Sequence, residues 1–374
     1  MKINKLIQII GLALVGLSGQ TAFAETTNPL TAKQLLGKKL FFETRFSNPA
    51  GQACASCHAP ESAFADPRNQ LPVSKGAMNG MFTSRNAPSI MYLAMVPKLH
   101  IDKKEGIYMG GLFYDGRAAT LEEQVEGPSF GHNEMAIKDK NELVAKLHKL
   151  GYKNDFKKVY GKTALANTEL AYLQLTQAIA AYERSAELNP FSSKFDYYLQ
   201  GKAKLSKQEQ RGRKVFEDEK KGNCAACHPL EPTRDDGTRP LLTDFSYDNL
   251  GVPGNGANPF LKLRGKVNPE GTQFVDLGLG KTVARADENG KFRVPSLRNV
   301  AVTAPYMHNG VFSTLKEVVD FYNTRDVDDK WGKPEVAKNV NKDELGDLKL
   351  TEQEVEDLVA FMKTFTDGYK LSSQ

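Results

Sequence analysis

Two five-residue stretches of the chain, Cys54-Ala-Ser-Cys57-His58 and Cys224-Ala-Ala-Cys227-His228, share one pattern. The pattern C-x-x-C-H is the attachment sequence of a c-type haem. The two thiols can each form a thioether to one porphyrin, and the adjacent imidazole can bind the iron. The 374-residue chain has four cysteines, and these two stretches contain all of them. The sequence therefore predicts two covalently bound haems c, attached through Cys54, Cys57, Cys224 and Cys227, with His58 and His228 on the iron.

Two other interpretations of the paired cysteines are open. The pairs could form local disulfides, or they could belong to a zinc site built from Cys and His. Neither interpretation explains why a histidine follows directly after each pair. The haem interpretation uses both histidines and leaves no cysteine over.

The N-terminus has the pattern of a secretory signal peptide. Lys2 and Lys5 form a basic start, an apolar run reaches to about Leu17, and Ala24 ends a small-residue cleavage pattern. The run is too short to span a bilayer comfortably, and no later stretch is apolar for long enough, so no membrane span is expected in the mature protein. An uncleaved anchor is the alternative. With residues 1–24 removed, we expect the protein in the periplasm, which suits haem attachment outside the cytoplasm.

The composition is that of an ordinary globular protein. Hydrophobic residues make up 40% and charged residues 25% of the chain. The formal net charge is +5, and it falls to +3 when the two lysines Lys2 and Lys5 are removed. This charge is small, and the lysines are scattered among acids, so we expect no nucleic-acid partner.

An internal repeat surrounds the two cysteine motifs. Thr31-Ala-Lys-Gln34 and Ser206-Lys-Gln-Glu209 both have the pattern of a capping box at the start of a helix. Gly37 and Gly212 follow at the same distance from their caps, and a cysteine motif follows each glycine. Such self-similarity predicts that each half begins with a short helix, then a loop, then a helix that carries the haem motif.

Each half is also expected to end in a helix. Apolar residues recur with helical spacing over 167–187, and again over 351–365 after a capping box that begins at Thr351. The last helix is a candidate to pack back on the N-terminal half.

The boundary between the halves is expected between Pro190 and Ser206. This gives an N-terminal domain over 25–195 and a C-terminal domain over 200–374.

The rest of the chain gives few strand signals. The stretch 230–290 is rich in Gly, Pro, Asn and Asp and should be mostly loop, with short hairpin strands near Thr272–Asp276. The expected fold class is mainly α, with many loops and few short strands.

The order of several further motifs resembles the bacterial dihaem cytochrome c peroxidase/MauG family over nearly the whole mature chain. Besides the cysteine motifs, the matching segments are Leu36-Gly-Lys-Lys-Leu-Phe-Phe42, Arg85-Asn-Ala-Pro88, Tyr114-Asp-Gly-Arg-Ala118, Leu121-Glu-Glu-Gln124, Gly127-Pro128, Glu134-Met135, and Val294-Pro-Ser-Leu-Arg-Asn299 through Thr303-Ala-Pro-Tyr-Met-His-Asn-Gly310. The resemblance implies two cytochrome c-like haem domains packed together. It further implies that the N-terminal haem reacts with hydrogen peroxide and that the C-terminal haem passes electrons to it.

The resemblance also implies roles for individual residues. His58 and His228 match the proximal iron ligands, and Gln124 and Glu134 match the pair beside the peroxide site. A carboxylate is suited to that place, because cleavage of the O–O bond needs a proton moved from one oxygen to the other. Taken without the resemblance, Glu134 would be a surface acid in a loop and Gln124 an exposed helix residue.

A calcium ion between the domains is implied as well. Asn86, Thr303 and Pro305 match the positions that hold it, and amide and carbonyl oxygens suit calcium. Asn86 is equally compatible with a simple turn.

The sequence departs from the peroxidase pattern on the N-terminal haem. Peroxidases of the family carry a second His in the segment that matches Val73-Ser-Lys-Gly-Ala-Met78, whereas Ala77 and Met78 stand there in this chain. The sixth position of this haem is therefore expected to be open without reductive activation. A thioether bond from Met78 to the iron is the alternative, although Met in a loop is more often a packing residue.

A second departure concerns the C-terminal haem. Peroxidases have a Met in the helix that follows the His-x-Gly turn, and counting from His308 places Tyr322 there. The capping-box pattern of Thr314 and Glu317 predicts a helix that carries Tyr322 about two turns in. MauG-type members have Tyr at this position as the axial ligand. A tyrosinate stabilises oxidised iron and lowers its potential, whereas Met raises it. The alternative is a core aromatic beside Phe321.

The third departure lies between the two haems. Tyr114 replaces the family's usual Trp; it can relay an electron, but it usually loses a proton when it does so. The single Trp, Trp331, is expected to be no part of that relay. An insert of about a dozen residues, judged against the family, precedes Tyr114 and contains His100.

The sequence gives weaker predictions for the positions of the remaining histidines. His100 and His148 are expected at the surface, and His132 is close enough to Glu134 in sequence to line the pocket. His308 is expected to support the C-terminal haem from behind its ligands.

Three functions follow from these features. The leading one is a periplasmic dihaem peroxidase that takes electrons from a small c-type cytochrome or a cupredoxin. The second is a MauG-like, peroxide-dependent oxidase that modifies residues of a partner protein; Tyr322 and the missing His favour it, and Tyr114 weakens it. The third is a dihaem electron carrier without chemistry of its own. A homodimer is left open.

Overall fold

The computed structural model describes residues 29–371, apart from residue 69 and residues 233–238. The predicted signal peptide, residues 1–24, lies outside the described residues. Within the described part of the chain, no helix is both long and apolar enough to cross a membrane.

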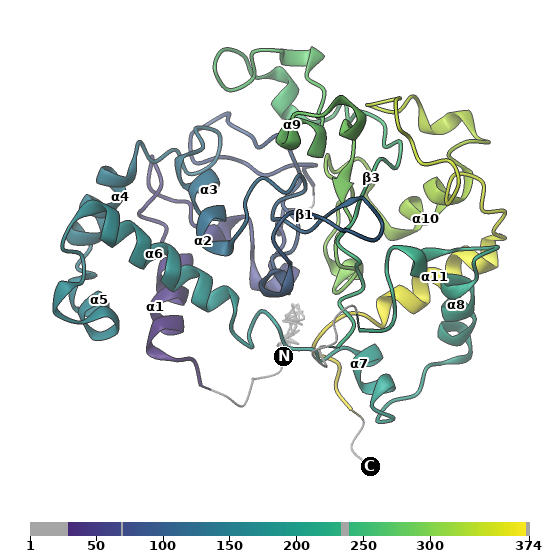
Figure 1. The fold of residues 1–374 in the computed structure, drawn as a ribbon, viewed down its shortest axis with the longest axis horizontal. Helices are drawn as coiled ribbons and strands as arrows, with labels where there is room; N and C mark the ends of the chain where they lie inside the picture. The colour runs from purple at the N-terminus through teal and green to yellow at the C-terminus, as the bar shows by residue number, and fades with distance from the viewer. Residues whose placement is uncertain (1–28, 69, 233–238, 372–374) are drawn as a thin grey trace, which may run out of the picture.

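The described chain is mainly helical, with short strands and long loops, as the sequence predicts. The helices are α1 (Ala32–Phe41), α2 (Leu121–Gln124), α3 (Glu126–Phe130), α4 (Lys140–Lys149), α5 (Lys153–Tyr160), α6 (Thr168–Glu183), α7 (Lys194–Leu199), α8 (Lys207–Glu217), α9 (Leu279–Val283), α10 (Leu315–Thr324) and α11 (Glu352–Lys363). The strands are β1 (His100–Ile101), β2 (Tyr108–Met109), β3 (Tyr247–Asp248) and β4 (Phe292–Arg293). Figure 1 shows two halves side by side, with α1 to α6 in one and α7, α8, α10 and α11 in the other.

The first half is built on the crossing of α1 and α6. Thr31 caps α1 with the predicted capping box. Gly37 lies at the crossing point, where a Cβ would come within 1.8 Å of the Ala178 carbonyl oxygen. Only glycine therefore lets the two backbones approach this closely. Phe41 and Tyr182 then meet edge to face across the helix pair, with ring centroids 5.5 Å apart.

The second half repeats this arrangement with α8 and α11. Ser206 caps α8 with the predicted capping box. A Cβ on Gly212 would come within 1.9 Å of the Asp357 carbonyl oxygen. Phe216 and Phe361 pack edge to face at 5.5 Å. The sequence repeat is therefore a repeat of one helix crossing, whose first helix precedes the cysteine motif and whose second helix follows it.

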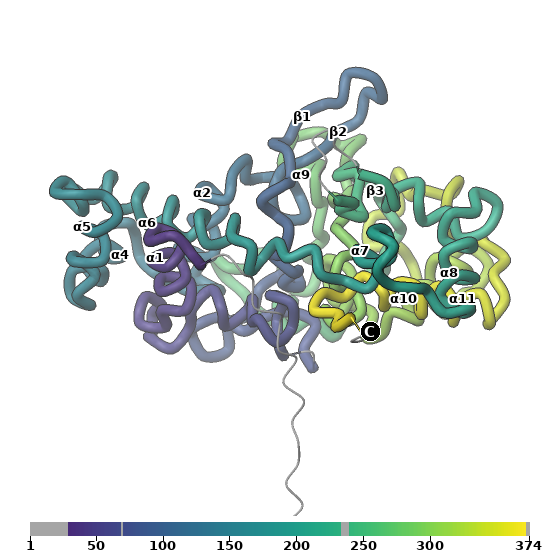
Figure 2. The backbone as a smooth tube through the Cα atoms, turned by 90° about the horizontal axis from the view of Figure 1, so that it is seen from below, coloured from purple at the N-terminus to yellow at the C-terminus, as the bar shows by residue number. Residues whose placement is uncertain are grey.

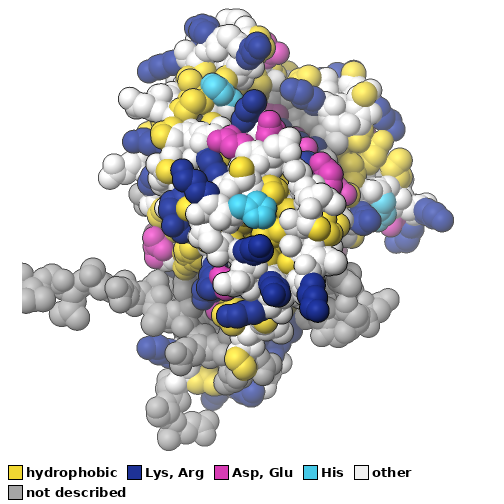
Figure 3. All heavy atoms as spheres, turned by 90° about the vertical axis from the view of Figure 1, so that its left-hand side faces the viewer, with side chains coloured by type: hydrophobic (Ala, Val, Ile, Leu, Met, Phe, Trp, Pro, Cys, Tyr) yellow, Lys and Arg dark blue, Asp and Glu magenta, His cyan; other side chains and the backbone are white. Residues whose placement is uncertain are grey.

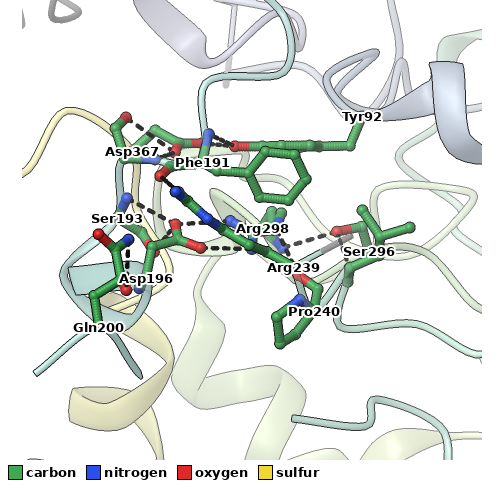
Figure 4. A network of polar contacts seen from close by, with 12 residues as sticks. Tyr92, Phe191, Ser193, Asp196, Gln200, Arg239, Pro240, Ser296, Arg298 and Asp367 are labelled. Carbon is green, nitrogen blue, oxygen red and sulfur yellow. Dashed lines mark hydrogen bonds and ion pairs between the residues drawn. The ribbon is translucent and has the colours of Figure 1, made fainter. Parts of the chain in front are cut away.

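The last helix does not pack back on the first half. Its buried side chains, among them Val355, Leu358 and Phe361, belong to the core that α8 and Leu315 of α10 also build. The chain after α11 makes the contact instead: Asp367 accepts a hydrogen bond from the Tyr92 hydroxyl at 2.7 Å (Figure 4). The helix itself ends at Lys363, a few residues before Asp367.

Helix α7 follows the connection between the two halves and packs on the second half. Phe195 packs in the second core, edge to face with Phe365 at 5.3 Å. Asp196 forms a buried ion pair with Arg298, with the Arg298 nitrogens Nη1 and Nη2 at 3.0 and 2.8 Å from its carboxylate oxygens (Figure 4). The segment from Pro190 to Ser206 is thus a packed connection rather than a free linker.

Two local predictions are wrong. Each cysteine motif begins on a single 3₁₀ turn, Cys54–Ser56 and Cys224–Ala226, instead of a longer helix. The residues near Thr272–Asp276 form a 3₁₀ turn and loop, and the short antiparallel pair of this region is β3 with β4.

The insert before Tyr114 forms a projecting arm. Strands β1 and β2 pair antiparallel, and the hairpin stands out from the body of the molecule (Figure 2). His100 is exposed on it, as predicted. The arm is fixed at its base, where the Gly110 backbone N–H donates to the Phe245 carbonyl at 2.9 Å.

Candidate functional site

A single cavity of about 970 Å³ joins the two halves. Its lining includes Cys54, Cys57 and His58 from the first motif and Cys224, Cys227 and His228 from the second. Helices α4 and α5, whose lysines are spread over the outer face seen in Figure 3, contribute nothing to this lining. The two motifs, although 170 positions apart in sequence, therefore face one enclosed space.

The first motif presents one nitrogen of His58 to the cavity. The ring Nδ1 lies 3.0 Å from the Phe64 carbonyl oxygen, so Nδ1 carries the proton and donates it to that oxygen. The free lone pair of the ring is therefore on Nε2. Burial lowers the pKa of His58, which keeps the ring neutral and able to bind a metal.

The second motif repeats the geometry. His228 Nδ1 lies 2.8 Å from the Leu242 carbonyl oxygen, and burial lowers the pKa of His228 to about 4. A carbonyl that fixes the far nitrogen of a ligating His is the common support of a metal-bound imidazole. Phe64 and Leu242 both have a positive φ, 56° and 55°, so the same turn conformation presents both carbonyls.

These residues fit covalently bound haem. All four cysteines are free thiols, and two lie beside each histidine. Among the described residues, no group of three or more His, Cys, Asp or Glu side chains is placed to hold a metal ion, which argues against the zinc interpretation. The cavity walls are largely apolar, with Phe41, Ile179, Phe216 and Met362 among them, as a flat apolar ring requires.

Glu134 and Gln124, the pair expected beside the peroxide site, line the same cavity as His58. Burial raises the pKa of Glu134, and the positive charge of Arg117 opposes this shift. Gly131 makes room for the carboxylate, since a Cβ there would lie 2.8 Å from Glu134 Oε2. The carboxyl near the first motif therefore holds its proton more tightly than a solvated glutamate does, which suits a group that exchanges a proton.

Two nearby candidates are not part of this wall. His132 is exposed and does not line the cavity, because the tight turn at Gly131 directs it outward while Asn133 faces in. Met78 does not line it either, and the Ala77 backbone N–H donates to the Glu134 carbonyl at 2.7 Å.

Tyr114 lies on the cavity wall between the two halves. Its carbonyl accepts a hydrogen bond from the backbone N–H of Arg293 at 2.8 Å, which ties the first half to β4. Burial raises the pKa of Tyr114, while the charges of Arg85 and Arg293 oppose the shift. Trp331 instead packs edge to face on Phe312 at 5.5 Å and does not line the cavity, as expected of a residue outside the relay.

Tyr322 lines the cavity from α10. The predicted capping box of Thr314 and Glu317 starts this helix. Burial is the main cause that raises the pKa of the Tyr322 phenol, and Cys227 and Cys224 are close enough to raise it further. The phenol is therefore placed beside the second cysteine pair, within the part of the cavity that His228 also lines.

The comparisons with known proteins agree with this geometry. The family model described as di-haem cytochrome c peroxidase matches residues 31–204, and the cytochrome c model matches residues 209–366. The methylamine utilization protein MauG of Paracoccus denitrificans is 38% identical over 363 residues, which cover 92% of this chain and 91% of that protein.

This chain belongs to the di-haem cytochrome c peroxidase/MauG family. Other relatives in this family of oxidoreductases include the cytochrome-c peroxidase IdrP1 of Denitromonas iodatirespirans, 33% identical over 91% of this chain and 83% of its own length. Among solved structures, the diheme peroxidase BthA from Burkholderia thailandensis E264 superposes with a TM-score of 0.80 at 36% identity, over 92% of this chain and 88% of that one. The chain therefore has the family fold of two cytochrome c-like domains, and membership of this family implies two haems c.

The three residues at the predicted calcium position, Asn86, Thr303 and Pro305, all line the cavity. The Asn86 backbone N–H donates to the His308 carbonyl at 2.7 Å, and its Nδ2 donates to the Pro72 carbonyl at 3.2 Å. The side-chain amide is therefore oriented by its nitrogen.

His308 lies behind this region of the family site. It is buried, its ring stacks on Phe292 with centroids 3.8 Å apart, and its Nε2 is 3.2 Å from Glu335 Oε2. Its predicted supporting position is compatible with these contacts. His148 is exposed, as predicted.

Two cavity residues are not indicated by any pattern in the sequence. Glu183 on α6 and Arg293 on β4 both line the cavity, and each has a buried polar atom without a hydrogen-bond partner among the described residues, Oε2 and Nε respectively. No local pattern marks them, because whether a charged side chain finds a partner depends on segments distant in sequence.

Proposed function

We propose that this protein is a periplasmic dihaem peroxidase that reduces hydrogen peroxide at the His58 side of the cavity. One observation carries the proposal: a single cavity is lined by both cysteine motifs and by Glu134, whose pKa is raised by burial. When bound, the haem irons supply the redox chemistry, with peroxide reduced at the first centre and electrons supplied by the second.

The chain's own residues supply proton handling and support. Glu134 takes the proton from one peroxide oxygen and returns it to the other, and the Gln124 amide orients the peroxide beside it. His58 and His228 serve as the iron ligands, each oriented by a carbonyl. Tyr114 is the proposed electron relay between the halves, because it lies on the wall that both halves share.

A MauG-like oxidase that modifies a partner protein is the second candidate. Two observations favour it: Tyr322 lines the cavity beside Cys224 and Cys227, and neither a His nor Met78 faces the His58 side from the segment 73–78. A tyrosinate ligand would lower the potential of the second centre and disfavour rapid electron uptake from a cytochrome.

Turnover separates these candidates. The holoprotein is mixed with reduced cytochrome c or a reduced cupredoxin, and hydrogen peroxide is added. Oxidation of the donor without a lag supports the peroxidase. No turnover, together with a long-lived oxidised state of the protein, supports the MauG-like oxidase. Two six-coordinate haems and no reaction with peroxide would leave only an electron carrier.

We also propose one calcium ion at Asn86, Thr303 and Pro305. The oriented Asn86 amide supports it, as does the place of all three residues on the wall of one cavity. Chelator treatment followed by calcium addition tests this point through the optical spectrum, which should change with the chelator and recover with calcium.

A further inference from the structure

Arg293 is a buried cation on the boundary between the two halves. The residue is 8% exposed and lies on β4, next to Tyr114. Its Nη1 lies 3.4 Å from the Val294 carbonyl oxygen, a long contact, and its Nε has no hydrogen-bond partner among the described residues. A guanidinium stays protonated in proteins, so this position holds a positive charge in a place with little water.

Two other deeply buried arginines each pair with a carboxylate, which Arg293 does not do within the described part of the chain. Arg298 forms a two-pronged ion pair with Asp196. Arg85 pairs with Asp276 through Nε and Nη2 at 2.6 and 2.7 Å, and its Nη1 lies 2.8 Å from Asp115 Oδ2. Among the described residues, Arg293 forms no ion pair with a carboxylate. A buried charge without a partner is costly, so an anion from outside the described chain is expected beside it.

The neighbouring side chains do not provide that anion. The groups that face Arg293 are the phenols of Tyr247 and Tyr114, and burial raises the pKa of both. The Tyr247 hydroxyl donates to the Gly110 carbonyl at 2.6 Å, which requires its proton. Arg85 is a second positive charge near Tyr114, and Asp115 and Asp276 are already engaged with it.

Arg293 lines the cavity that both cysteine motifs face. A haem brings two propionate carboxylates, and the planar fork of a guanidinium matches a carboxylate with two parallel hydrogen bonds. We propose that Arg293 binds a propionate of one of the two haems at the boundary between the halves, beside Tyr114. This inference rests on the two haems of the proposed function.

The pairing has a consequence for the redox centres. A fixed positive charge near a haem favours the reduced iron, which carries one positive charge less. Arg293 is therefore a positioning residue that raises the potential of the haem it binds. Because the Arg293 backbone N–H also donates to the Tyr114 carbonyl, Arg293 fixes the position of that haem edge relative to the proposed relay residue.

The test compares the holoproteins of Arg293→Gln, Arg293→Lys and Arg285→Gln. Arg285 is exposed and pairs with Asp287, so its variant removes the same charge from the surface of the same half. Haem content is counted first through the pyridine haemochrome. A wild-type protein without two haems would end the proposed function, independently of Arg293.

Midpoint potentials are then measured by spectroelectrochemistry, and propionate bending bands by resonance Raman. We expect Arg293→Gln to lower the potential of at least one haem and to shift its propionate band, with Arg293→Lys between it and the wild type. Potentials and bands equal to those of Arg285→Gln would overturn the proposal. Should Arg293→Gln not assemble with two haems, Arg293→Lys decides: a shifted propionate band supports the pairing, and an unchanged band overturns it.

Discussion

The Tyr92 hydroxyl donates a hydrogen bond to Asp367 Oδ2 at 2.7 Å, and this contact joins the tail after the last helix to the first half of the molecule. Both residues are 8% exposed or less. Asp367 also accepts from Asn299 Nδ2 and from the Ser192 backbone N–H, each at 2.8 Å. Burial, together with the neighbouring acid, raises the pKa of Tyr92 well above its ordinary value, so the phenol stays a donor. The two cores are thus held by a buried polar contact as well as by packing.

Replacing Tyr92 by Phe should destabilise the protein. The change removes the donor to Asp367 and the acceptor of the Phe191 backbone N–H, while the ring and its packing stay. Leaving buried polar groups unpaired costs about 1–3 kcal/mol in the free energy of unfolding. Urea unfolding of the holoprotein measures it. Tyr369→Phe is the control, because its hydroxyl has no hydrogen bond among the described residues, and equal unfolding midpoints for the two variants would contradict the prediction.

Glu134→Gln should impair peroxide turnover specifically. The amide keeps the shape of the side chain but cannot carry the proton, so kcat/KM for peroxide should fall about 10²–10⁴-fold. Haem content and the ferric spectrum of the second centre should stay as in the wild type. Glu126→Gln, an exposed acid on α3, is the matched control. Turnover by Glu134→Gln within a factor of about two of that control would remove Glu134 from the mechanism.

The features that the sequence predicts well are local ones. The capping boxes at Thr31, Ser206, Thr314 and Thr351 all form, because a cap depends on residues three positions apart. The cysteine motifs likewise bring their own histidine. The internal repeat of the two halves is also visible in the sequence, through Gly37 and Gly212. The sequence does not show, however, that each glycine packs against a later helix.

The predictions that fail are those that depend on the tertiary structure. His132 is close to Glu134 in sequence but does not share its place on the cavity wall, because the turn at Gly131 directs it outward. The last helix has an apolar face that would fit either half, and the crossing with α8 decides between them. Arg293 and Glu183 look like ordinary surface charges in the sequence, because their isolation in the cavity results from segments far away in the chain.

Glu183→Gln should change how stability depends on pH. Burial is the main cause that raises the pKa of Glu183 to about 8 from an ordinary 4.5, so the folded protein holds this proton more tightly than the unfolded chain does. The stabilisation is complete below about pH 4.5 and is lost as the pH rises through about 8. At one pKa unit per ~1.4 kcal/mol, the rise from 4.5 to about 8 corresponds to a loss on the order of 5 kcal/mol for the wild type over this window.

The neutral amide of Glu183→Gln should remove that loss, so the variant should match the wild type near pH 5 and exceed it near pH 8. Unfolding free energies from urea titrations at several pH values measure the difference. Glu169→Gln, an exposed acid on the same helix, should follow the wild-type curve. Parallel curves for Glu183→Gln and the wild type would show that Glu183 titrates normally.

Tyr322 is the residue whose replacement best separates the two proposed activities. If its phenolate binds the second iron, Tyr322→Met should raise the midpoint potential of that haem, because a thioether favours reduced iron and a phenolate favours oxidised iron. The same variant should oxidise reduced cytochrome c with peroxide faster than the wild type, since electron uptake becomes easier. Tyr306→Phe is the control: Tyr306 lines the same cavity, but its hydroxyl donates to the Val300 carbonyl at 2.9 Å. A ferric electron paramagnetic resonance spectrum and a potential unchanged in Tyr322→Met would show that Tyr322 is a core aromatic beside Phe321, and would leave the MauG-like interpretation without its main support.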